Sequence, residues 1–99
     1  MRIQVSQEQI EAFCRKWKIR ELALFGSVLR DDFRPDSDVD VLVEFASDAR
    51  HSLFDRMEMI EELEALFGRQ VDLVRKELVV NPYRRQHILA NHQVMYAAA

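Results

Sequence analysis

The chain has 99 residues, of which 48% are hydrophobic and 31% are charged, and its net charge at pH 7 is −3. This length and balance predict one soluble globular domain, and the acidic excess argues against a broad basic surface for nucleic acid. No run approaches the ~20 apolar residues that cross a bilayer, and the first residues do not resemble a signal peptide, so we expect a cytoplasmic protein without membrane contact. Cys14 is the single cysteine, which excludes an internal disulfide.

The first predicted element is a helix over residues 6–18. Ser6 and Gln9 have the spacing of a capping box, and an apolar stripe follows at positions 10, 13, 14 and 17. Cys14 lies in that stripe, so we expect a buried structural thiol and not a nucleophile. An apolar run then predicts a strand over residues 21–25, directly before a Gly26–Ser27 turn.

The Gly26–Ser27 turn has the composition of an anion-binding corner. Glycine permits a positive φ and close backbone approach. If residues 28–30 open a short helix, their N–H groups and the Ser27 hydroxyl would cradle a phosphate; the simpler alternative is a plain strand-to-helix turn. Arg30 follows directly, where its guanidinium could pair with a triphosphate or, equally, with Asp31 or Asp32 on the surface.

A second strand is predicted over residues 39–45, with Asp38 and Asp40 at its head. Side chains two apart on a strand share a face, so these carboxylates would stand side by side and repel. A divalent cation between them would relieve the repulsion, and carboxylate oxygens suit Mg²⁺. The alternative is the wet face of an amphipathic strand whose inward face is formed by Val39, Val41, Val43 and Phe45.

A second helix is predicted over residues 53–67, capped by Ser52 and Asp55 and ended by Gly68. Its packed side is expected to be Met57, Ile60, Leu63, Leu66 and Phe67, with Met59 at the margin. Residues 71–74 predict a third strand that carries Asp72. This carboxylate is either exposed on an edge strand or lies beside Asp38 and Asp40, where it would complete a triad.

Pro82 is expected in the first turn of a third helix over residues 83–90, with Asn91 as its stop. Residues 94–96 predict a short fourth strand at the sheet edge. This strand or the third helix could pair with a second copy or with a partner protein. Four nearby basic residues are either solvated charge or a patch for a triphosphate or an acidic partner: Arg75, Lys76, Arg84 and Arg85.

The motif formed by Gly26-Ser27, ten further residues and Asp38-Val39-Asp40 resembles the signature of the DNA polymerase beta-like nucleotidyltransferase superfamily. With Arg30 and Ser37 included, it is similar to the minimal nucleotidyltransferase branch, and the resemblance covers nearly the whole chain. It implies an α/β (α+β) fold with a small mixed sheet of about four strands flanked by about three helices.

The resemblance also implies a Mg²⁺-dependent nucleotidyltransferase. Asp38, Asp40 and Asp72 would hold two magnesium ions, and Asp72 would bind a metal or take the proton of the attacking hydroxyl. Gly26, Ser27 and Arg30 would hold ATP.

Members of this branch are antitoxins that transfer AMP from ATP to a tyrosine of a HEPN ribonuclease toxin, so the implied partner is such a toxin. Two alternatives stay open at this point. One is an antitoxin that acts by binding alone, and the other is a stand-alone nucleotidyltransferase for a small molecule. The sequence leaves open a homodimer or a hetero-oligomer with the toxin.

Overall fold

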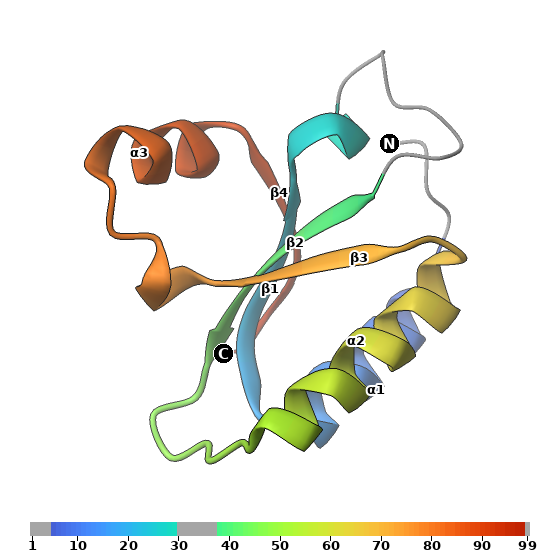
Figure 1. The fold of residues 1–99 in the computed structure, drawn as a ribbon. Helices are drawn as coiled ribbons and strands as arrows, with labels where there is room; N and C mark the ends of the chain where they lie inside the picture. Colours follow the sequence, from blue (N-terminus) through green and yellow to red (C-terminus); the bar gives the residue numbers. More distant parts are fainter. Residues whose placement is uncertain (1–4, 30–37, 99) are drawn as a thin grey trace.

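The computed structural model describes residues 5–29 and 38–98, except for the side chain of Ser27. This part of the chain forms a four-stranded sheet with three α-helices (Figure 1). In chain order the elements are α1 (Gln7–Lys16), β1 (Ile19–Phe25), β2 (Val39–Phe45), α2 (Leu53–Phe67), β3 (Val71–Arg75), α3 (Pro82–Ala90) and β4 (His92–Ala97), with short 3₁₀ turns at Gly26–Leu29 and Lys76–Leu78. The predicted α/β fold class is confirmed.

The strand order is β3-β2-β1-β4. Strand β1 is antiparallel to both β2 and β4, whereas β2 and β3 are parallel. The sheet is therefore mixed, as expected, and the predicted edge position of the fourth strand is confirmed. That strand is longer than predicted, because it runs from His92 to Ala97 alongside β1.

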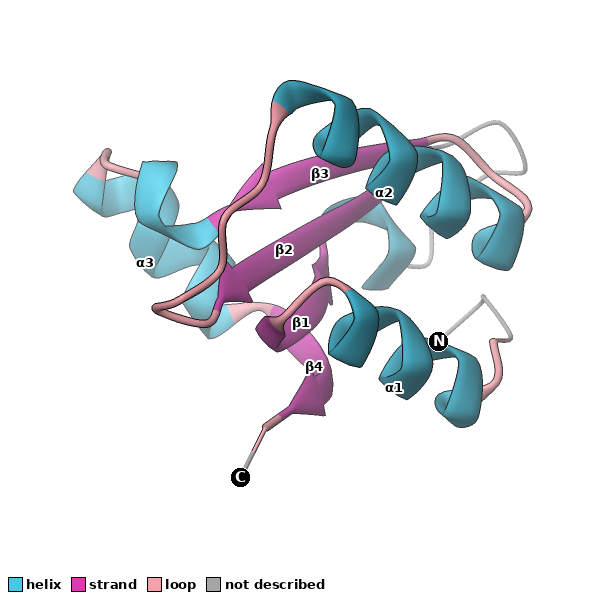
Figure 2. Ribbon diagram, turned by 90° about the horizontal axis from the view of Figure 1, so that it is seen from below, coloured by secondary structure: helices cyan, strands magenta, loops and turns pink. Residues whose placement is uncertain are grey.

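The two faces of the sheet are covered differently (Figure 2). Val39, Val41 and Val43 of β2 point into the main core, which α1 and α2 cover. The intervening residues point to the opposite face, where Leu42 packs in a smaller cluster with Ile88 of α3. Since α3 covers this second face alone, part of it stays open to solvent, and Asp40 belongs to this face by alternation along β2.

Helix α1 is shorter than predicted. Ser6 is its N-cap, and the Ser6 hydroxyl accepts a hydrogen bond from the Gln9 N–H at 3.4 Å. The helix ends at Lys16, because Lys18 adopts a left-handed φ of 55° that turns the chain into β1. Strand β1 consequently begins at Ile19, two residues before the predicted start, and the Ile19 side chain is buried in the core.

Helix α2 has both predicted caps but a different buried face. Ser52 and Asp55 form a reciprocal capping box, and Gly68 ends the helix at a φ of 67°. The prediction for the methionines was wrong: Met59 is 1% exposed and Met57 is 54% exposed. Residues 59, 63 and 67 follow an i, i+4, i+8 row toward the sheet, and a residue two positions away from such a row faces solvent.

Burial of Cys14 between α1 and the sheet confirms the structural role predicted for this thiol. Desolvation, followed by the nearby Glu11 carboxylate, raises the pKa of Cys14 from 9.0 to about 12. The thiolate form that reacts with electrophiles is therefore scarce in the folded protein at neutral pH.

We expect Cys14 in the folded protein to stay unreacted with the thiol reagent DTNB at pH 8 and to react fully in guanidinium chloride. Absorbance of the released thiolate measures both rates, and a Cys14→Ser variant gives the background. Rapid titration of the thiol in the native protein would contradict the burial on which this expectation depends.

No helix within residues 5–29 and 38–98 combines the length and apolar character that a membrane crossing requires.

Candidate active site

Four residues in register, one on each strand, form a row across one end of the sheet face that α3 covers only in part. The strand registers pair Asp72 of β3 with Asp40 of β2, Asp40 with Phe25 of β1, and Phe25 with His92 of β4. Paired residues on neighbouring strands point to the same face of a sheet. The fold therefore brings two of the three predicted carboxylates into direct register, on neighbouring strands whose spacing is ~4.8 Å.

Gly26 follows Phe25 at the end of this row and lies against Asp40. It adopts a φ of 76°, a left-handed conformation that favours glycine. A Cβ atom at this position would overlap the Asp40 carboxylate oxygen Oδ2 and would lie 3.2 Å from its Cγ. Because position 26 has no side chain, the Gly26 backbone can contact the Asp40 carboxylate.

A short 3₁₀ helix, Gly26–Leu29, begins at this glycine, two residues before the start considered from the sequence. Val28 is buried in the core and anchors this turn. The predicted anion-binding contributions of the Ser27 hydroxyl and of Arg30 fall outside the part of the chain that the structure describes.

The position of Asp72 combines parts of both alternatives, although the described residues form no closed carboxylate triad. Asp72 lies on an edge strand and is exposed, and it is also in register with Asp40. Helix α2 fixes this edge: the Glu64 carboxylate accepts from the Val71 N–H at 3.1 Å, and the Arg56 guanidinium donates to the Leu73 carbonyl at 2.6 Å. These contacts on either side of Asp72 satisfy polar groups of the outer edge and position the carboxylate.

Asp38 is exposed and directly precedes β2, whose first N–H, from Val39, donates to the Gln70 carbonyl at 2.9 Å. Alternation along an extended segment places Asp38 on the face of Asp40. In the described ranges, no three His, Cys, Asp or Glu side chains already converge as a metal site. The all-carboxylate donor set still fits Mg²⁺, since rotation of the exposed Asp38 and Asp72 side chains toward Asp40 needs no change in the core.

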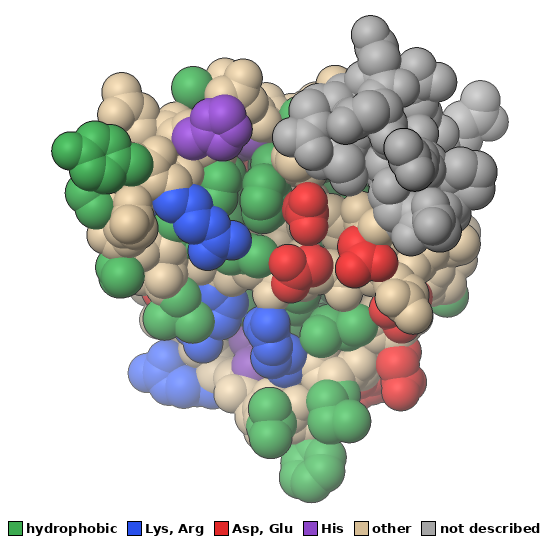
Figure 3. All heavy atoms as spheres, turned by 45° about the horizontal axis from the view of Figure 1, so that its top comes forward, with side chains coloured by type: hydrophobic (Ala, Val, Ile, Leu, Met, Phe, Trp, Pro, Cys, Tyr) green, Lys and Arg blue, Asp and Glu red, His purple; other side chains and the backbone are tan. Residues whose placement is uncertain are grey.

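A cleft of about 850 Å³ opens beside Asp40 and Gly26. Its size lies within the range of small-molecule binding sites. Figure 3 shows this end of the molecule, where acidic side chains gather beside the grey atoms and basic and histidine side chains lie to their left. The described residues that line the cleft come from β1, the 3₁₀ turn, β2, α3 and β4: Phe25, Gly26, Leu29, Asp40, Arg84, His87, Ile88, Asn91, His92 and Gln93.

The basic patch considered from the sequence includes Arg84 on this side of the cleft, but the other lining residues of α3 and β4 were not predicted. Arg84, His87 and Ile88 recur at i, i+3 and i+4 and thus share one stripe of α3, and Asn91, the C-cap residue, follows at its end. This spacing is visible in the sequence, but spacing alone does not determine which face of a helix packs on a sheet. Only the burial of Ile88 shows that the stripe faces the sheet.

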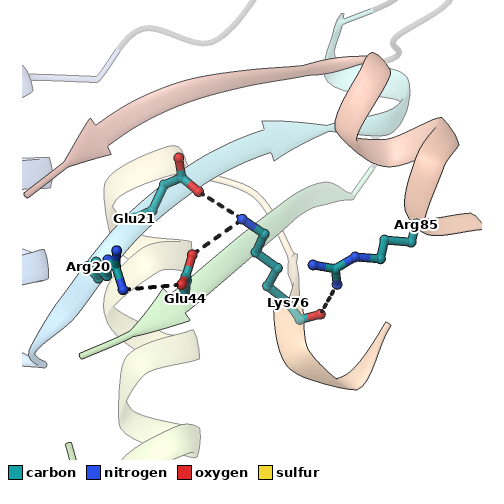
Figure 4. A network of polar contacts seen from close by, with 5 residues as sticks. All are labelled: Arg20, Glu21, Glu44, Lys76 and Arg85. Carbon is teal, nitrogen blue, oxygen red and sulfur yellow. Dashed lines mark hydrogen bonds and ion pairs between the residues drawn. The ribbon is translucent and has the colours of Figure 1, made fainter. Parts of the chain in front are cut away.

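The other end of the same face carries a structural charge network (Figure 4). Glu21 and Glu44 are paired across β1 and β2, an arrangement of like charges that would repel. The Lys76 ammonium lies 3.5 Å from the Glu21 carboxylate and 3.3 Å from that of Glu44, and the Arg85 guanidinium donates to the Lys76 carbonyl at 3.1 Å. Two of the basic residues considered as a ligand patch thus act within the fold.

A family model, that of the nucleotidyltransferase domain, matches residues 6–95 of the chain. This range includes Gly26, the three predicted carboxylates at positions 38, 40 and 72, and helix α3. The chain belongs to the nucleotidyltransferase domain family. This membership makes the protein a transferase by family and confirms the resemblance seen in its motif.

Two relatives of this nucleotidyltransferase refine the assignment. A candidate protein adenylyltransferase of Methanocaldococcus jannaschii is 40% identical over 73 residues, which are 74% of this chain and 73% of the relative. The protein adenylyltransferase MntA of Thermococcus cleftensis is 46% identical over 61 residues, which are 62% of this chain and 60% of MntA. These similarities confirm the predicted minimal nucleotidyltransferase branch.

Solved structures share the fold of this nucleotidyltransferase. One is a chain in the complex of a tri-AMPylated HEPN toxin of Shewanella oneidensis with an MNT antitoxin. The two chains superpose with a TM-score of 0.64 at 20% identity, over 93% of this chain and 70% of the other. The common fold includes the mixed sheet that carries the carboxylate row.

Proposed function

We propose that this nucleotidyltransferase is an antitoxin that transfers AMP from ATP to a tyrosine hydroxyl of a cognate HEPN ribonuclease and thereby neutralises it. The protein adenylyltransferases among its relatives and the HEPN toxin in the solved complex support this proposal. Because the reaction uses ATP and an intracellular ribonuclease, the proposed place of action is the cytoplasm. The proposed catalytic unit is the single domain formed by residues 1–99.

The observation that carries the proposal is the contact of Gly26 with Asp40 in the row that also holds Asp72. A nucleoside triphosphate needs close backbone approach for its phosphates and acidic ligands for its divalent cation. The cleft wall brings Gly26 and Asp40 together, Asp72 is in register with Asp40 on the next strand, and the α3 side adds a permanent positive charge at Arg84.

The proposed reaction is phosphoryl chemistry in which the protein mainly supplies position and charge. The tyrosine oxygen attacks the α-phosphorus of ATP, the bond from that phosphorus to the oxygen bridging the β-phosphate breaks, and pyrophosphate leaves. Asp38, Asp40 and Asp72 would hold magnesium, which supplies neutralising charge at the triphosphate. Asp72 would accept the phenolic proton, and Gly26, Ser27 and Arg30 would hold the phosphates.

We expect purified protein to label its cognate HEPN partner when supplied with Mg²⁺ and ATP that carries the radiolabel at the α-phosphate. Label at the γ-phosphate should not transfer, because the γ-phosphate leaves with pyrophosphate. Chelation with EDTA should abolish labelling, and added Mg²⁺ should restore it. Autoradiography measures the transfer, and mass spectrometry of the partner identifies the modified residue.

One alternative is an antitoxin that acts by binding alone: Asp40 and Asp72 are in register, but no three acidic or histidine side chains of the described residues come together as a metal site. A toxin-protection assay in cells, combined with the labelling experiment, separates the two functions. Protection of cells from the toxin by a variant with both Asp38→Ala and Asp40→Ala, without any label on the partner, would replace the catalytic proposal with the binding one. Labelling of a small hydroxyl compound in the absence of any partner protein would favour a stand-alone enzyme.

A further inference from the structure

We propose that Arg84 of α3 binds the β- and γ-phosphates of the nucleotide from the side of the cleft opposite Asp40 and Gly26. This inference rests on the proposed function and assigns a phosphate-binding role to a residue outside the sequence motif. Arg84 would be a binding residue that touches the substrate, and the discrimination between ATP and AMP would depend on it.

The orientation of Arg84 follows from the packing of its helix. Asn81 caps α3, since its side chain accepts hydrogen bonds from the Tyr83 and Arg84 N–H groups at 3.0 Å. One turn later, Ile88 is 5% exposed and packs on Phe25 and its neighbours in the smaller core cluster. Residues four apart lie on one helix face, so burial of Ile88 directs Arg84 toward the same cleft.

The position of α3 relative to Asp40 determines which part of ATP Arg84 can contact. The row runs from Asp40 through Phe25 to His92, two strand spacings or roughly 10 Å away, and His92 also lines the cleft. The reacting α-phosphate belongs beside the carboxylates and their cation. A triphosphate that extends from Asp40 along this row toward His92 would lie beside α3, the helix that carries Arg84.

The charge of the lining residues points to the phosphates and not to the base. Among the described residues of the cleft, Arg84 is the one with a permanent positive charge, and Asp40 is the one with a carboxylate. A guanidinium binds phosphate oxygens in a bidentate manner, whereas a neutral nucleobase needs no cation. The adjacent Arg85 is excluded from this role, because it donates to the Lys76 carbonyl and does not line the cleft.

The experiment measures binding of ATP, ADP and AMP by isothermal titration calorimetry in Mg²⁺ buffer, without an acceptor protein. We expect Arg84→Gln to weaken ATP binding about tenfold or more while AMP binding changes less than about twofold, so that the ATP-to-AMP affinity ratio collapses. Arg84→Lys should recover part of the ratio, because it restores the charge without the planar fork. Arg85→Gln removes the same charge from the next position and should keep the wild-type ratio.

Thermal denaturation of each variant confirms that the binding protein is folded. A folded Arg84→Gln variant with the wild-type ATP-to-AMP ratio would overturn the assignment of Arg84 while leaving the proposed function intact. An equal loss of ATP and AMP affinity would also overturn it, because the contact would then lie on the nucleoside or the α-phosphate. Failure of the wild-type protein to bind ATP at all would overturn the proposed function together with this inference.

Discussion

Substitution of Asp40 by asparagine is expected to reduce AMP transfer about 1,000-fold or more. Asparagine keeps the shape of the side chain but removes the charge at the one carboxylate that contacts Gly26 and shares a register with Asp72. The loss should therefore appear in transfer rate and in the Mg²⁺ dependence of ATP binding, and not in the fold. The measurement is initial-rate labelling of the HEPN partner over a range of Mg²⁺ concentrations.

Stability of the Asp40→Asn variant separates a chemical role from a structural one. Asparagine is close in size and shape to aspartate, and Asp40 belongs to neither apolar core cluster, so we expect the variant to stay folded, which thermal denaturation checks. Glu44→Gln is the matched control, since Glu44 lies on the same strand and face but pairs with Lys76. We expect this control to keep transfer activity. Wild-type activity in folded Asp40→Asn protein would remove Asp40 from the proposed chemistry.

The position of the carboxylates could be predicted because strand alternation is a local property. Asp38 and Asp40 precede and interrupt a run of valines, so placing the valines in the core fixes the acidic side chains on the other face. The register of Asp72 with Asp40 is not local, because α2 separates the two strands and the sequence does not state where they pair. The position of Asp72 beside Asp40 was expected from the resemblance of the motif to a known family and not from periodicity.

The α3 side of the cleft could not be predicted for a related reason. Arg84 and Arg85 are adjacent and chemically identical, yet neighbouring residues on a helix point ~100° apart. Their separate roles follow from the burial of Ile88, which depends on how α3 docks on Phe25 and Leu42. The same kind of dependence explains the error over Met57 and Met59, where tertiary packing chose between two apolar positions.

Substitution of Gly26 by alanine tests the contact on which the candidate site depends. The new Cβ would overlap Asp40 Oδ2, and a φ of 76° is strained for any residue with a Cβ. We expect a loss of stability and, because the carboxylate must move, a fall in AMP transfer of about 100-fold or more. Chemical denaturation and initial-rate labelling measure the two effects.

Gly68→Ala is the matched control for the backbone strain. Gly68 has a similar φ of 67°, but a Cβ there would meet no atom within 4 Å. It should cost only the strain of the left-handed conformation, about 1–2 kcal/mol, and leave transfer unchanged. The stability lost by Gly26→Ala beyond this value then measures the clash with Asp40.

A double-mutant cycle assigns that excess to one pair of atoms. Asp40→Ala removes the carboxylate and leaves its Cβ 3.5 Å from the new methyl group, an ordinary van der Waals contact. In this background the cost of Gly26→Ala should fall to that of Gly68→Ala, which gives a coupling energy between positions 26 and 40. Equal costs of Gly26→Ala with and without the carboxylate would show that the glycine serves only its backbone conformation. Gly26 and the Asp40 carboxylate would then be independent, and the proposal of a shared nucleotide site would lose its central contact.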